Sequence, residues 1–65
     1  MKPVCKLIGE NGNVFNLIGI VRNTLKEYAL EEELCKFDAE LKKIQETGGS
    51  YDDVLILIMR FVEVE

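Results

Sequence analysis

Residues 50–65 read SYDDVLILIMRFVEVE, and this stretch decides the fold. Ser50 and Asp53 have the spacing of a capping box, in which each side chain accepts a hydrogen bond from the backbone amide of the other residue. We therefore expect a helix from Tyr51 to about Phe61. Because apolar residues cover more than half of its circumference, this helix is predicted to be the central, most buried element of the protein.

The chain is predicted to end in a short strand that pairs with its beginning. Residues 62–65 read VEVE, an alternation of apolar and acidic side chains that is typical of a half-buried strand. Its expected partner is a strand over Val4–Ile8, which follows Pro3, a residue that favours the start or edge of a strand. The expected cross-strand charge pairs join Lys2 and Lys6 to Glu63 and Glu65. The alternative is a single long strand over Val54–Val64, where β-branched residues are dense, but the capping box favours the helix.

Two further helices are expected between these strands. Asn13 is a good N-cap, and the apolar residues after it recur at spacings of three and four, which predicts a helix from about Val14 to Tyr28. Two residues fit this helix poorly: Gly19 costs about 1 kcal/mol in a helix interior, and Ile20 points with the polar side chains.

The next helix is expected from Glu31 to about Glu46. Three glutamates open it and lysines lie near its end, as the helix dipole prefers. Its apolar stripe is narrow and consists of Leu34, Phe37, Leu41 and Ile44. We expect the ion pairs Glu32–Lys36 and Asp38–Lys42 on its surface, and residues 47–50, TGGS, to end it.

Together these elements predict one α+β domain over residues 1–65, in the order β-α-α-α-β. Three helices pack on a two-stranded ribbon formed by the N-terminal and C-terminal strands, because an isolated ribbon is only marginally stable. Cys5 is expected to be a small core residue on its strand. The predicted core comprises Leu7, Val14, Ile18, Val21, Leu25, Leu34, Phe37, Leu41, Val54, Leu55, Ile58, Phe61 and Val62.

The composition argues against several classes of function. The chain has 65 residues, a net charge of −4 and scattered basic residues, so binding to nucleic acid is not expected. The longest apolar run, Val54 to Met59, is far too short to cross a membrane. Residues 1–10 lack the apolar run of a secretory signal, and the two cysteines make a poor disulfide framework. We therefore predict a cytoplasmic protein with reduced thiols.

No residue pattern points to catalysis, a cofactor or a metal. The chain has no histidine, which removes the commonest proton shuttle and zinc ligand. The turn at residues 9–12, GENG, precedes a helix, but Glu10 puts a negative charge where an anion would bind. The clusters at 31–33 and 52–53 lie in first helical turns, where acids stabilise the helix dipole. A reactive Cys35 would need more than the one neighbouring charge of Lys36. We therefore expect no enzyme, cofactor, metal or small-molecule ligand.

Four apolar residues are left over once the core faces are assigned: Phe15, Ile20, Ile56 and Met59. Ile56 projects among Asp52, Asp53, Arg60 and Glu63. Such residues, if scattered, are ordinary features of a protein surface. Together they indicate an interface with a partner protein or a homodimer seam.

Three stretches resemble a family of short uncharacterised proteins from phages and conjugative elements of Gram-positive bacteria. They are KLIGENGNVFNLIG at 6–19, GGSYDDVL at 48–55 and MRFVEVE at 59–65. The resemblance spans nearly the whole chain and is weakest over residues 26–46. It implies a bacterial, intracellular setting in a mobile genetic element, and it assigns no activity.

Three hypotheses of function follow. The first is a non-enzymatic accessory or protein-interaction module of a mobile element. The second is a nucleic-acid-linked regulator, either a weak binder or an acidic mimic that occupies a DNA-binding protein. A titration with DNA that shows no salt-dependent binding would remove its direct form. The third, an enzyme or enzyme subunit that uses Cys35 or a carboxylate, requires a reactive thiol or a pair of carboxylates in a cleft.

Overall fold

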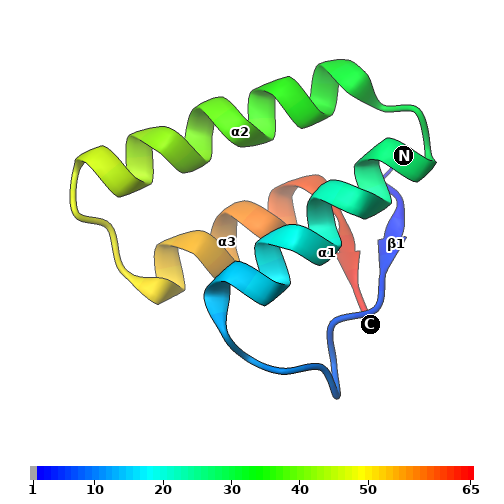
Figure 1. Cartoon of the computed structure of the whole chain (residues 1–65), viewed down its shortest axis with the longest axis horizontal. Helices are drawn as coiled ribbons and strands as arrows, with labels where there is room; N and C mark the ends of the chain where they lie inside the picture. Colours follow the sequence, from blue (N-terminus) through cyan, green and yellow to red (C-terminus); the bar gives the residue numbers. More distant parts are fainter. Residues whose placement is uncertain (1) are drawn as a thin grey trace.

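The computed structural model describes residues 2–65 and has the expected β-α-α-α-β order (Figure 1). The two strands lie side by side at the right of Figure 1, and α1, α2 and α3 pack on one another beside them. The α+β prediction is confirmed. The elements are β1 (Val4–Cys5), α1 (Val14–Glu27), α2 (Glu31–Glu46), α3 (Tyr51–Phe61) and β2 (Glu63–Val64).

The strands are parallel, with Val4 opposite Glu63 and Cys5 opposite Val64. The amide of Glu63 donates to the carbonyl of Pro3, and the amide of Glu65 donates to that of Cys5, each at 2.9 Å. A parallel pair needs a long crossover connection, and here the three helices together provide it.

Both strands are shorter than predicted: the first covers Val4–Cys5 and not Val4–Ile8, and the second covers Glu63–Val64 and not residues 62–65. The amides of Leu7 and Ile8 both donate to the one carbonyl of Glu65, each at 2.7 Å, so the regular ladder does not continue through them. The predicted lysine–glutamate pairs do not form among residues 2–65. Lys2 Nζ instead donates to the carbonyl of Met59 at 2.9 Å, which fastens the start of the described chain to the end of α3.

Helix α1 begins where the sequence predicts. The side chain of Asn13 accepts from the amide of Phe15 at 2.9 Å, which satisfies one of the free amides of the first turn. Leu17, Val21 and Leu25 are buried. Ile20 is partly buried against the core, so its assignment to the polar side was wrong. Strand β1 contacts α1, and Cys5 Sγ lies 3.4 Å from Thr24 Oγ1, one turn after Ile20 along that helix.

The turn between α1 and α2 contains a strained residue. Ala29 has a φ of 56°, in the left-handed region that costs a residue with a side chain about 1–2 kcal/mol. The conformation persists because the next amide, that of Leu30, donates to the carbonyl of Leu25 at 2.9 Å and closes the helix end.

Helix α2 packs through its predicted stripe but forms different ion pairs. Asp38 bonds to Arg22 of α1, with 3.1 Å between Nε and Oδ1, and Lys36 lies 3.8 Å from Glu33. The predicted pairs Glu32–Lys36 and Asp38–Lys42 are therefore not those that the structure forms. Arg22 Nη2 donates to Asp38 Oδ2 at 3.3 Å, whereas Nε lies within ion-pair distance of Oδ1 without donating a hydrogen bond.

Helix α3 has the complete capping box predicted from the sequence. Ser50 Oγ accepts from the amide of Asp53 at 3.3 Å, and Asp53 Oδ2 accepts from the amide of Ser50 at 2.9 Å. Val54, Leu57 and Ile58 are buried, and the helix ends at Phe61 before β2 begins. The single long strand over Val54–Val64 is excluded.

Most of the predicted core is confirmed. Cys5 is also buried as expected, and its sulfur lies 3.4 Å from Thr24 Oγ1. Five predicted core residues are only partly buried at its edge: Val14, Ile18, Leu34, Leu55 and Phe61. Two buried residues, Leu17 and Leu57, were not in the predicted set. The buried residues that were predicted for the core are Leu7, Val21, Leu25, Phe37, Leu41, Val54, Ile58 and Val62.

Replacing Ala29 with glycine should stabilise the fold. Glycine adopts a positive φ without steric cost, and its greater freedom in the unfolded chain offsets only part of that gain. We expect Ala29→Gly to raise the free energy of unfolding by about 0.5–1 kcal/mol in a urea titration. The matched control Ala39→Gly, at an exposed position inside α2, should lower it by about 1 kcal/mol. A loss of stability in both variants would contradict the strain at Ala29.

Gly19 and Gly49 should respond to alanine in opposite directions. A Cβ at Gly49 would lie 2.5 Å from Ile44 Cγ2, whereas a Cβ at Gly19 would meet nothing within 4 Å. Gly49→Ala should therefore lower the free energy of unfolding by about 1–3 kcal/mol. Gly19→Ala should raise it by up to about 1 kcal/mol through helix propensity. Urea titrations of the two variants measure both effects, and equal effects would argue against the tight turn after α2.

Candidate protein-binding surface

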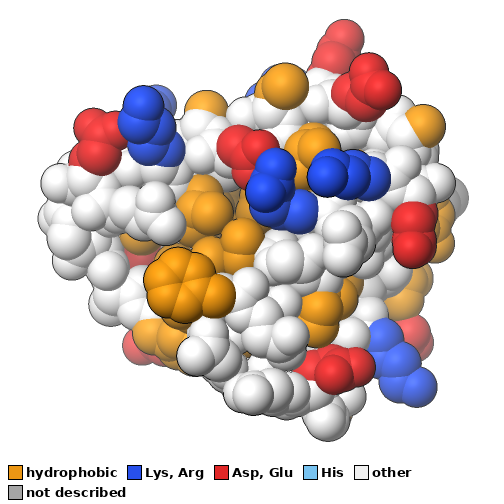
Figure 2. Space-filling model, in the orientation of Figure 1, with side chains coloured by type: hydrophobic (Ala, Val, Ile, Leu, Met, Phe, Trp, Pro, Cys, Tyr) orange, Lys and Arg blue, Asp and Glu red, His pale blue; other side chains and the backbone are white. Residues whose placement is uncertain are grey.

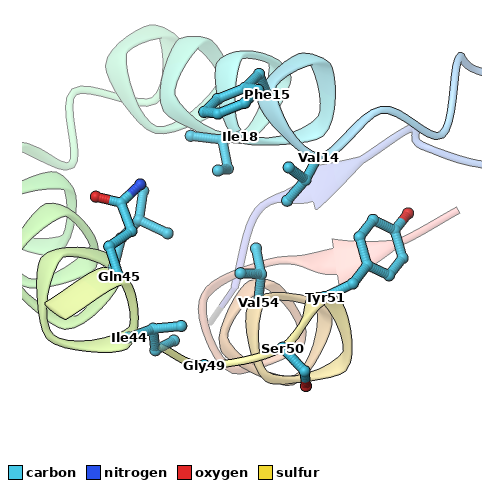
Figure 3. A pocket seen from close by; sticks show the side chains of 10 residues that line it. Val14, Phe15, Ile18, Ile44, Gln45, Gly49, Ser50, Tyr51 and Val54 are labelled. Atoms are coloured by element: carbon cyan, nitrogen blue, oxygen red, sulfur yellow. The ribbon is translucent and has the colours of Figure 1, made fainter. Parts of the chain in front are cut away.

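One hollow lies between the start of α1, the end of α2 and the start of α3 (Figure 3). Its volume is about 230 Å³, and apolar side chains line most of it. In Figure 3, Ile18 from α1, Ile44 from α2 and Val54 from α3 surround the space. Phe15 lies beside it and is 73% exposed. Figure 2 shows hydrophobic side chains gathered in the region enclosed by the three helices.

A second hollow, of about 330 Å³, lies between α3 and the segment that joins β1 to α1. Ile8 and Met59 line it and are largely exposed. Tyr51 lines both hollows, and its hydroxyl donates to the carbonyl of Gly12 at 2.8 Å. That bond ties the start of α3 to the segment before α1. The remaining lining residues are Leu7, Glu10, Gly12, Leu17, Leu55, Ile58 and Val64.

The third feature is the side of α3 that faces away from the core, formed by Asp52, Ile56, Met59 and Arg60. We call it the α3 outer face. All four residues are exposed, Ile56 at 56% and Met59 at 52%. Spacings of three and four residues place them together on the helix surface. A partly apolar surface therefore lies on the opposite side of the helix from its buried residues.

The structure separates the four residues predicted for an interface. Ile56 and Met59 share the α3 outer face, whereas Phe15 lies on α1 beside the first hollow. Ile20 packs against the core and is only partly accessible. Sequence reasoning missed Ile8, which is 73% exposed beside the second hollow. Side chains alternate between buried and exposed over residues 4–8, and Cys5 and Leu7 are buried. This alternation was the signal that could have identified Ile8 as exposed.

The charges at the two ends of the α3 outer face have no partners within residues 2–65. Neither Asp52 nor Arg60 takes part in an ion pair or a side-chain hydrogen bond there. Asp53, the adjacent acid, is engaged in the capping box. Asp52 and Arg60 are therefore free to interact with a partner.

The candidate chemical residues lie on different elements, except that Glu31, Glu32, Cys35 and Lys36 line one open hollow on α2. Gly9 has a φ of 92°, and Asn11 Oδ1 accepts from the amide of Asn13 at 3.0 Å, so the GENG segment is held by its own hydrogen bonds. Cys35 is exposed on α2, and Cys5 is buried. Within residues 2–65, no three side chains of the metal-binding types gather closely enough to hold a metal ion. In the same range, no helix is long and apolar enough to cross a membrane.

Comparisons with models of protein families, with curated proteins and with solved structures give no match to this chain.

The two thiols should differ sharply in reactivity. In the native protein Cys35 should react with a thiol reagent such as 5,5′-dithiobis(2-nitrobenzoate) at the rate of an ordinary exposed thiol, because it is accessible. Cys5 should react only as fast as the protein unfolds, because it is 1% exposed. The variant Cys35→Ser assigns the fast phase. Reaction of both thiols at one rate would contradict the burial of Cys5.

Proposed function

We propose that this protein is a non-enzymatic accessory module of a mobile genetic element and that it acts by binding protein through the α3 outer face. One observation carries the proposal: Ile56 and Met59 are more than half exposed on a helix whose other side forms the core. Apolar groups that neighbour one another on a surface and are rimmed by charges are typical of protein interaction sites.

The position of this surface on α3 suits it to binding. Helix α3 is fixed by its buried residues and by its capping box, so little further ordering is needed when a partner docks. The two apolar side chains supply the water-excluding centre, and Asp52 and Arg60 supply a charged rim. The same residues offer no nucleophile beside a base, which favours binding over catalysis.

The setting in a mobile element is supported by the resemblance of residues 6–19, 48–55 and 59–65 to a family of phage and conjugative-element proteins. A cytoplasmic location belongs to the same proposal. It is supported by Cys5 and Cys35, which are free cysteines and not a disulfide.

Replacing Ile56 with lysine should abolish binding and leave the fold intact. The change puts a charge at the centre of the α3 outer face, at a position 56% exposed that the core does not use. We expect at least a tenfold loss of recovered partner, whether a second copy or another protein, in affinity capture from the bacterial host. Circular dichroism should show unchanged helix content.

The matched control is Phe15→Lys, which places the same charge at an exposed apolar position on α1. This variant should retain binding. If the two variants lose recovered partner equally, binding does not depend specifically on the α3 outer face. A wild-type protein that binds neither itself nor any other protein would refute the proposed function.

A further inference from the structure

The α3 outer face is self-complementary. Ile56 is the middle residue of α3, which runs from Tyr51 to Phe61. Asp52 lies four residues before it and Arg60 four residues after it, each about 6 Å away along the helix axis. The face therefore carries a negative charge at one end, a positive charge at the other and an apolar side chain between them.

We propose that the partner of this face is a second copy of the same chain, bound with its α3 antiparallel, so that Asp52 of each copy pairs with Arg60 of the other. This inference rests on the proposed function, because it names the occupant of the same surface. In a two-fold interface, a contact from one residue to another is repeated in reverse. Antiparallel helices centred on Ile56 satisfy this condition and form the ion pair twice.

Helix packing supports the same arrangement. Asp52, Ile56 and Arg60 form a ridge of residues spaced by four, and packing of such ridges is the commonest way in which helices pack in globular proteins. In the proposed dimer, this ridge packs alongside the same ridge of the second molecule. Met59 adds a second apolar side chain beside Ile56 at the centre of the contact. A parallel arrangement would bring Asp52 against Asp52 and Arg60 against Arg60, which charge repulsion disfavours.

The neighbouring charges leave the pair available. Glu33 lines the same hollow as Arg60, but it lies 3.8 Å from Lys36. Lys2, which is positively charged like Arg60, also lines that hollow, and its ammonium group donates to the carbonyl of Met59. No ion pair within residues 2–65 involves Arg60. One face of a three-turn helix is smaller than the roughly 800 Å² per partner of a standard interface, so we expect a weak, concentration-dependent dimer.

Charge reversal tests the antiparallel pairing directly. Asp52→Arg leaves positive charges at both ends of the face, and Arg60→Asp leaves negative charges at both ends. In sedimentation equilibrium each variant alone should self-associate about tenfold or more weakly than the wild type, because both ion pairs become repulsive. An equimolar mixture of the two variants should associate with about wild-type affinity, because each end then meets an opposite charge. The double variant Asp52→Arg/Arg60→Asp should also form a homodimer.

Two controls separate this outcome from general effects of charge and folding. Glu46→Arg and Lys42→Asp make the same changes in net charge at exposed positions of α2, and both should leave self-association unchanged. Circular dichroism of each variant reports its folding. If Asp52→Arg does not fold, oxidation of Ile56→Cys in a Cys35→Ser background provides the second measurement, and it should yield a covalent dimer faster than Phe15→Cys does.

A wild-type protein that stays monomeric at millimolar concentration would overturn the inference. So would a dimer that is indifferent to charge reversal, or single variants that do not associate when mixed. The two proposals can fail separately: if the wild type is monomeric but Ile56→Lys abolishes the capture of a different protein, the proposed function stands and only the second copy as partner is wrong.

Discussion

The burial of one side of α3 is the constraint on which the rest of the structure depends. Val54, Leu57 and Ile58 are buried, and α3 contacts both other helices. The same helix leads directly into β2, so its position also determines where the end of the chain meets β1. In a chain of 65 residues the buried fraction of the surface is small, and the loss of one such contact removes a large part of the stability.

Local signals in the sequence were sufficient to predict the helices. Asn13 and the Ser50–Asp53 box each satisfy backbone amides within four residues, so their effect does not depend on the rest of the fold. The ends of α2 follow from the acids at its start and the TGGS turn after it. These features explain why the helix bounds agree closely with those predicted and why the long-strand alternative failed.

The features that were missed depend on contacts between elements distant in sequence. The spacing of charges along α2 indicates Lys42 as the partner of Asp38, but only the packing of α1 on α2 brings Arg22 into reach. Ile20 was assigned to the polar side because a period of 3.6 residues does not reveal which further elements pack against α1. The parallel direction of the strands likewise follows from the path of the whole chain between them. For the candidate surface, the sequence identified Ile56 and Met59 but could not show that Phe15 lies beside a different hollow.

The exposed apolar residues of α3 are flanked by charged side chains. Ile56 lies between a negative and a positive side chain. An unrelated apolar surface that covers Ile56 would also remove water from Asp52 and Arg60. Such a surface offers these charges no ion pair or hydrogen bond in return, so its binding is penalised. A partner with the opposite order of charges meets no such penalty. In the proposed binding role, the arrangement would discriminate between partners through the cost of burying unpaired charge. The outer side of the central helix suits that role, because the packing that holds the fold together also holds Ile56 and Met59 in position.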